Sequence, residues 1–188
     1  MRILFLSRWF PYPPSNGSKL RIFNLLRGLA QVHEVTLLSF ADQLEVDAGA
    51  AELRAVCRQV QVVPWKAYNP NSRRARLGFL SLTPRFVVDT YSQEMGRQIE
   101  SLLAADNYDL VIASQLDMAV YSRCFGRTPA LFEEVEVGVL YENFVRAESL
   151  WPRLRHGLTW AKHRRYLASL LQDFQLATVV SERERDLL

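Results

Sequence analysis

Short runs of apolar residues alternate with segments of helical periodicity along most of the chain. Residues 2–7 form a nearly continuous apolar run, which is typical of a strand buried on both faces of a sheet. The apolar positions between residues 22 and 29 then repeat at the spacing of one helix face. The same alternation predicts further strands over residues 35–40, 59–63, 109–114, 130–133 and 177–180. It predicts further helices over residues 44–56, 73–82, 93–105, 117–125 and 138–172, the last with a break at Pro152.

This order of strands and helices predicts an α/β fold, a Rossmann-like parallel sheet flanked by helices and joined by right-handed crossovers. The strand at 59–63 alternates polar and apolar residues, so we expect it nearer an edge. In such sheets, ligands bind at the carboxyl ends of the strands, where the chain order reverses. The loops expected to bind a ligand are therefore those that follow residues 6, 40, 63, 114, 133 and 180.

Composition narrows the class of protein. The 188 residues are 49% hydrophobic and 23% charged, which is ordinary for a folded domain. The net charge of +3 is too small to indicate nucleic acid binding, but it fits an anionic substrate or an acidic membrane surface. The apolar run after Arg2 ends at Arg8, too early for a signal peptide, and Cys57 and Cys124 lack the spacing of metal ligands. We expect a cytoplasmic protein with free thiols.

The loop over residues 10–18 is the first candidate for chemistry. It contains Gly17, which would let the backbone approach a ligand, and it leads into a helix whose free N–H groups suit an anion. Arg21, in the first turns of that helix, could add a forked donor. A proline-stiffened turn with a helix cap explains the loop equally well. The chain has neither the dinucleotide fingerprint nor a P-loop, which disfavours a standard NAD-dependent dehydrogenase or a P-loop kinase.

Two other loops hold polar residues at the ends of predicted strands. Asp117 could accept a hydrogen bond from a sugar or acceptor hydroxyl, or it could cap the next helix, and Gln115 is a plausible polar contact. Glu133, Glu134 and Glu136 form an acidic cluster that could bind hydroxyls, or that could be a solvated turn. No histidine lies near them in the sequence, so we expect no metal site.

Cations and aromatic residues mix over residues 151–166, and a second basic cluster lies at 73–76. Such mixtures occur at anionic membrane interfaces, although a solvated helix packed on the domain is also consistent with the pattern. The histidines of the first segment, His156 and His163, are expected at the surface, and His33 is expected to be structural.

Three segments, in this order, resemble the N-terminal domain of the retaining GT-B glycosyltransferases of group 1, or family 4. Residues 1–40 resemble the family's opening strand, Pro- and Gly-containing loop, helix with an early Arg, and His-Glu-Val strand. The sequence YDLVIASQLDMA (108–119) resembles the strand and loop before its central site, and FQLATVVSERERDLL (174–188) resembles its last N-domain strand. The likeness spans nearly the whole chain.

The resemblance implies that residues 1–188 are an acceptor-side domain. A C-terminal domain, absent from this chain, would bind the nucleotide sugar. The full-length enzyme would move a hexosyl-type sugar from a nucleotide diphosphate sugar to a hydroxyl of a sugar or lipid-linked acceptor, with retention and without a cofactor. The matching residues Asn16, Gly17 and Ser18 would lie near the diphosphate, although many members have two adjacent glycines where this chain has one. Asp117 would be catalytic, with Arg21, Gln115, Glu136 and Ser181 among the substrate-binding residues.

Ser181 and Glu184 form a capping-box pattern that starts a last helix. This helix reaches Leu188 after about two turns, so we expect the natural polypeptide to continue into a second domain. The alternative is a free-standing Rossmann-like domain that acts as a non-catalytic binding or scaffold partner. A reading frame that continues into a second βα domain with paired glutamates would favour the transferase. A nucleotide-binding regulator or an oxidoreductase finds no supporting motif.

Overall fold

A computed structural model of the chain describes residues 1–42 and 50–187. Within this part, six parallel strands form one sheet in the order β3-β2-β1-β4-β5-β6. The chain order reverses between β1 and β4, which is the topology of Rossmann-like folds. The predicted fold class is therefore confirmed, and β3 lies at an edge as expected. The strands are β1 (Arg2–Ser7), β2 (Glu34–Ala41), β3 (Gln59–Pro64), β4 (Leu110–Ser114), β5 (Ala130–Val135) and β6 (Leu176–Val179).

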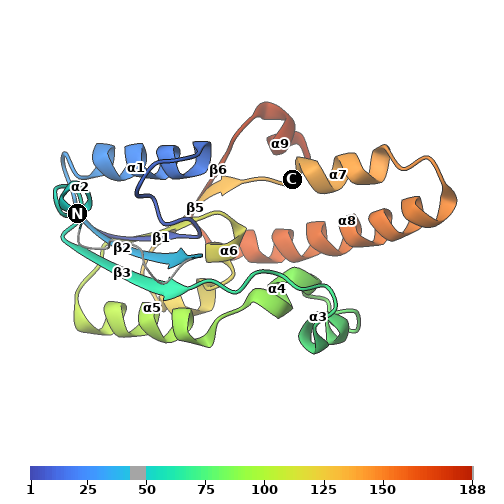
Figure 1. The fold of residues 1–188 in the computed structure, drawn as a ribbon, viewed down its shortest axis with the longest axis horizontal. Coiled ribbons are helices and arrows are strands. Elements are labelled where there is room, and N and C mark those ends of the chain that lie inside the picture. Colours follow the sequence, from blue (N-terminus) through green and yellow to red (C-terminus); the bar gives the residue numbers. More distant parts are fainter. Residues whose placement is uncertain (43–49, 188) are drawn as a thin grey trace.

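Helices cover both faces of the sheet, with α1 on one face and α5 on the other (Figure 1). Two further helices, α7 and α8, form a hairpin that extends past the carboxyl ends of the strands (Figure 1). The helices are α1 (Gly17–Leu29), α2 (Ala51–Arg54), α3 (Arg73–Leu77), α4 (Arg85–Thr90), α5 (Gln93–Ala105), α6 (Leu116–Ala119), α7 (Gly138–Val145), α8 (Leu150–Leu170) and α9 (Glu182–Leu187), with 3₁₀ turns η1 (Ser122–Phe125) and η2 (Leu171–Asp173).

The central strand β1 is buried on both faces, as its continuous apolar run predicts. Leu4 and Leu6 pack in a core with α5, α6 and α8, whereas Ile3 and Phe5 pack in a second core with α1 and α2. Each of these side chains contributes about 1.5–3 kcal/mol by leaving water. The two cores hold β1 and β4 rigid, so the residues that follow them are presented from a fixed base.

The helix predicted over 73–82 and the helix predicted over 117–125 are both shorter in the structure. The first ends at Leu77 with Gly78 as its C-cap, and the second divides into α6 and η1. The helix α4, which the sequence did not predict, follows Pro84. Of the helix predicted over 44–56, residues 44–49 lie outside the described residues, and α2 accounts for part of the remainder.

Pro152 does not break the helical region, contrary to the prediction. It lies in the first turn of α8, where a backbone N–H has no partner within the helix and its loss costs little. The break falls before it, over residues 146–149, between α7 and α8.

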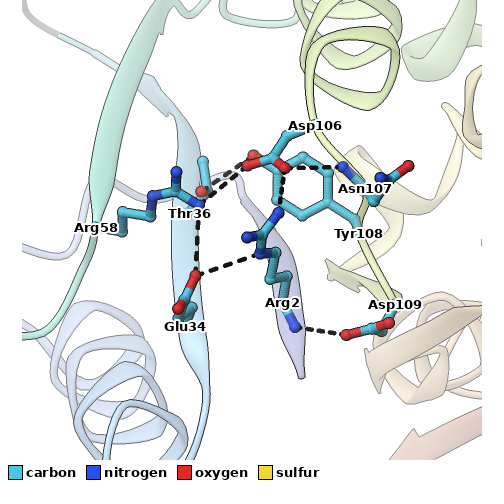
Figure 2. A network of polar contacts seen from close by, with 8 residues as sticks. All are labelled: Arg2, Glu34, Thr36, Arg58, Asp106, Asn107, Tyr108 and Asp109. Atoms are coloured by element: carbon cyan, nitrogen blue, oxygen red, sulfur yellow. Dashed lines mark hydrogen bonds and ion pairs between the residues drawn. The ribbon is translucent and has the colours of Figure 1, made fainter.

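Charged side chains tie together the amino ends of the strands (Figure 2). Arg2 pairs with Glu34 (Nε–Oε2 3.4 Å), and Arg58 pairs with Asp106 (Nη1–Oδ2 3.0 Å). The backbone N–H of Arg2 also donates to Asp109 (2.7 Å). These groups satisfy one another, so we assign this edge a structural role, with each exposed pair worth less than about 1 kcal/mol.

The buried carboxylate of Asp89 anchors the segment between β3 and α3 to α4. It accepts hydrogen bonds from Lys66 Nζ (2.9 Å), the backbone N–H of Asn69 (2.8 Å) and Ser72 Oγ (2.5 Å). Burial by itself would raise the pKa of Asp89, but these hydrogen bonds and the charge of Lys66 outweigh it and lower the pKa to about 2. Asp89 is therefore ionised throughout the ordinary pH range.

We predict that Asp89→Asn lowers the free energy of unfolding by about 2 kcal/mol at neutral pH, because hydrogen bonds to a charged group are lost. Since the folded pKa lies below the unfolded value near 3.9, this contribution is present above the unfolded value and is lost as the pH falls toward 2. Urea unfolding across this range measures it. Glu94→Gln, which breaks an exposed pair with Arg97, is the control and should have little effect on stability. Equal acid sensitivity of wild type and Asp89→Asn would contradict the prediction.

Candidate functional site

Two carboxylates at the carboxyl end of β5 are joined to α1 and to the end of β4. The guanidinium of Arg21 pairs with both Glu133 and Glu134. Ser114 Oγ donates to the second oxygen of Glu133 (2.6 Å), and Gln115 Nε2 donates to the second oxygen of Glu134 (3.0 Å). The fork of Arg21 is thus occupied by carboxylates, which argues against the predicted anion-binding role of this residue.

An irregular backbone brings these groups together. Successive residues of a regular strand point to opposite faces, yet Glu133 and Glu134 both contact Arg21. The register of β5 against β6 shifts between Phe132 and Val135, and Glu134 has a φ of 65°. Such a bulge re-aims a side chain at a cost of about 1–2 kcal/mol in backbone strain. Burial raises the pKa of Glu133, while Ser114 and Arg21 oppose that effect.

Asp117 lies in the first turn of α6, next to a buried arginine. Burial raises the pKa of Asp117, and the positive charge of Arg8 opposes the rise. The guanidinium of Arg8 lies between the rings of Trp9 (4.3 Å) and Trp65 (3.8 Å) and pairs with Asp42 (2.7 Å). Within the described residues, the Asp117 carboxyl makes no hydrogen bond.

The N-cap position of α6 is occupied by Gln115, with a φ of 68° and no side-chain cap. The alternative in which Asp117 caps this helix is therefore wrong. The carboxyl group of Asp117 therefore remains available to a ligand.

A cavity of about 260 Å³ opens beside these residues at the carboxyl edge of the sheet. Its wall combines an aromatic ring from the loop after β1, polar groups from the start of α6 and the end of β5, and two residues of α8. The lining residues are Trp9, Gln115, Leu116, Asp117, Phe132, Glu134, Val135, Glu136, His163 and Leu167.

Three of the predicted site residues, Gln115, Asp117 and Glu136, meet in this cavity. Arg21 is not among the lining residues, but it pairs with Glu134, which is.

The structure places the other predicted site residues outside the cavity lining. Asn16 caps α1, its Oδ1 accepting from the Lys19 N–H (3.0 Å), and Ser181 caps α9, its Oγ accepting from the Glu184 N–H (3.2 Å). Gly17 and Ser18 begin α1, and no described residue lies within 4 Å of the position that a Cβ on Gly17 would take. Within residues 1–42 and 50–187, no close approach requires a glycine there.

The sequence predictions missed Trp9 and misplaced His163. His163 was expected at the surface, but it is only 3% exposed. The cations of α8 spread around the helix and obscure its inner face. The available signal was the spacing of His163, Leu167 and Leu170, which are the buried residues of α8 and follow helical periodicity.

No three His, Cys, Asp or Glu side chains in the described part of the chain gather so that they could hold a metal ion. In residues 1–42 and 50–187, no helix is both long and apolar enough to span a membrane.

No protein-family model and no curated protein matches the chain. Solved structures resemble it weakly. UGT2 of Phytolacca americana, complexed with UDP-2fluoro-glucose and pterostilbene, is 13% identical with a TM-score of 0.44, over 76% of this chain and 32% of that one. Apo UGT2 of the same plant is 13% identical with a TM-score of 0.42, over 77% of this chain and 32% of that one. UGT71G1 of Medicago truncatula, complexed with UDP-glucose, is 12% identical with a TM-score of 0.41, over 79% of this chain and 32% of that one. The chain thus matches about a third of the length of these proteins.

Proposed function

We propose that this chain is the acceptor-side domain of a glycosyltransferase that moves a sugar from a nucleotide diphosphate sugar to an acceptor hydroxyl, with retention of configuration. The cavity at the strand switch point is the observation on which this depends. Gln115, Asp117 and Glu136 offer the amide and carboxylate groups that hydrogen-bond hydroxyls, beside the ring of Trp9. The three segments that resemble group 1 transferases support the same proposal, including the implied synthesis of glycans, glycolipids or polysaccharides.

In this proposal Asp117 accepts a hydrogen bond from the acceptor hydroxyl, because its carboxyl faces the cavity and has no hydrogen-bond partner among the described residues. The departing diphosphate needs cationic or N–H donors. Arg21 is already paired with two carboxylates, so most of those donors belong to a second domain. The exposed start of α1, at Asn16, Gly17 and Ser18, could supply further N–H groups from this domain.

A transfer assay with radiolabelled UDP-, GDP- and ADP-sugars tests the proposal on the full-length gene product and on residues 1–188. We expect transfer by the former and none by the latter. Turnover by residues 1–188 alone would contradict the division between two domains. A full-length protein that transfers no sugar and shows no thermal shift above about 2 °C with any nucleotide sugar would favour the non-catalytic binding domain instead.

We further propose that the α7–α8 hairpin touches an anionic membrane from the cytoplasmic side, where a lipid-linked acceptor would be held. At its tip Leu150 and Trp151 are 87% and 81% exposed, beside Arg153. The basic helix α3 contacts α8, since Lys162 Nζ donates to the carbonyl of Gly78 (2.6 Å). Exposed apolar groups beside cations suit the surface of an acidic bilayer.

We predict that Trp151→Ser combined with Leu154→Ser weakens binding to vesicles containing anionic lipid by about tenfold or more, because two apolar side chains no longer enter the interface. Vesicle sedimentation measures this effect, and pure phosphatidylcholine vesicles should bind less. Val32→Ser, which changes an equally exposed residue at the amino edge, is the matched control. Unchanged binding of the double variant would rule out this surface.

A further inference from the structure

His163 lies in the wall of the cavity with both ring nitrogens unpaired. The residue is 3% exposed, and neither Nδ1 nor Nε2 has a hydrogen-bond partner among the described residues. A buried polar group without a partner costs about 1–3 kcal/mol, so such groups in proteins nearly always have one. The cavity that His163 lines is where the partner would lie.

The ring is held from behind and offers two complementary groups. Phe86 of α4 packs 6.0 Å from it, between ring centroids. Burial lowers the pKa of His163 to about 4, so the ring is neutral at pH 7. A neutral imidazole has one donor nitrogen and one acceptor nitrogen, and either of them can pair with a hydroxyl group, which both donates and accepts.

The remaining wall selects against anions. Asp117, Glu134 and Glu136 place three carboxyl groups around the cavity, whereas two cations act on them: Arg21 pairs with Glu134, and the charge of Arg8 acts on Asp117. A phosphate or carboxylate would be repelled, whereas uncharged hydroxyls would be bound. Trp9 and Leu167 add apolar surface for the C–H face of a ring. The volume of about 260 Å³ lies just below the roughly 300–1,000 Å³ of drug-sized sites and suits a single ring.

We propose that this cavity binds one uncharged sugar ring, and that His163 is a binding residue that hydrogen-bonds a ring hydroxyl through one of its two nitrogens. The assignment of that ring to the acceptor rests on the proposed transferase function. The presence of a neutral-sugar subsite rests on the cavity and on His163 alone.

The first experiment follows the ring nitrogens of ¹⁵N-histidine-labelled protein by NMR during titration with methyl glucoside, methyl galactoside, methyl mannoside and, separately, inorganic phosphate. The expected result is a saturable shift of the His163 nitrogens with at least one glycoside and none with phosphate. If no glycoside shifts them, the proposal is wrong. If phosphate shifts them equally, the neutral class of ligand is wrong.

The second experiment compares His163→Leu with His33→Leu. His33 is a useful control because its Nδ1 is also buried and unpaired, but it lies at the opposite edge of the sheet. We expect His163→Leu to bind the glycoside about three- to tenfold more weakly, as for the loss of one hydrogen bond, and to remain as stable as wild type. Equal binding by His163→Leu would mean that the ring has only a packing role. Should this variant fail to fold, the titration of the wild type still decides.

These results are separable from the transfer assay. Glycoside binding without transfer by the full-length protein would leave the subsite standing and remove the transferase. Transfer without glycoside binding at His163 would support the transferase and rule out the subsite.

Discussion

Asp117→Asn should lower the rate of sugar transfer by the full-length protein by about 10–100-fold, as expected for the loss of a hydrogen bond to a charged group. The carboxyl lines the cavity and makes no hydrogen bond within the described residues, so the change removes chemistry rather than a structural contact. Burial raises the pKa of Asp117, which means that the ionised form costs stability in the folded protein. The free energy of unfolding should therefore be unchanged or slightly higher in the variant.

The pH dependence of transfer offers an internal check. The ionised carboxylate is the stronger hydrogen-bond acceptor, so kcat/KM should fall as the pH drops through the raised pKa of Asp117. Asp117→Asn should lack this fall. Glu136→Gln, at the exposed rim of the same cavity, is the matched control and should mainly raise KM. A stable Asp117→Asn protein with wild-type kcat/KM would exclude the role assigned to this residue.

Arg21→Met should lower the free energy of unfolding by about 2–3 kcal/mol. It leaves Glu133 and Glu134 adjacent, largely buried and without their cation, and removing one partner of a buried ion pair costs about 3–5 kcal/mol. We take a smaller value because the side chain of Arg21 is 38% exposed and water screens part of the charge. For a domain of this size the melting temperature should fall by about 4–12 °C.

The pH dependence of this variant should differ from that of the wild type. Losing Arg21 removes an effect that lowers the pKa of Glu133, so the folded pKa rises further above its unfolded value. Stability is then fully present below the unfolded value and falls as the pH rises through the folded pKa. Adding Glu133→Gln should recover part of the loss, and Arg27→Met, on the exposed side of the same helix, should have little effect. Urea unfolding between pH 4 and pH 8 measures this effect. A loss of unfolding free energy in Arg21→Met that is the same at every pH would contradict the prediction.

The Arg21 cluster shows where the sequence predictions reached their limit. The pattern placed Glu133 and Glu134 at the end of a strand and Arg21 early in a helix, and both positions are confirmed. It did not indicate that these residues contact one another. Their pairing depends on the bulge in β5, and no local feature predicts the positive φ of Glu134.

The capping box at the start of α9 gives a second example. Ser181 accepts from the N–H of Glu184, as the pattern predicts. Glu184 does not return the bond, because its carboxylate accepts instead from the N–H groups of Val137 (2.7 Å) and Gly138 (3.0 Å) at the start of α7. Figure 1 shows α9 beside α7. The tertiary contact prevails because it satisfies two buried donors rather than one exposed donor.

The sequence by itself determined the strands and their parallel arrangement, since these follow from the alternation of apolar runs and amphipathic helices. It also predicted the edge at which ligands would be bound, and Gln115, Asp117 and Glu136 as candidate residues there, because they are polar residues that follow buried strands. Only the tertiary structure decided that His163 lines the same cavity and that Arg21 pairs with two carboxylates. Both outcomes depend on which side chains meet across elements far apart in the chain, and periodicity within one element holds no information about that.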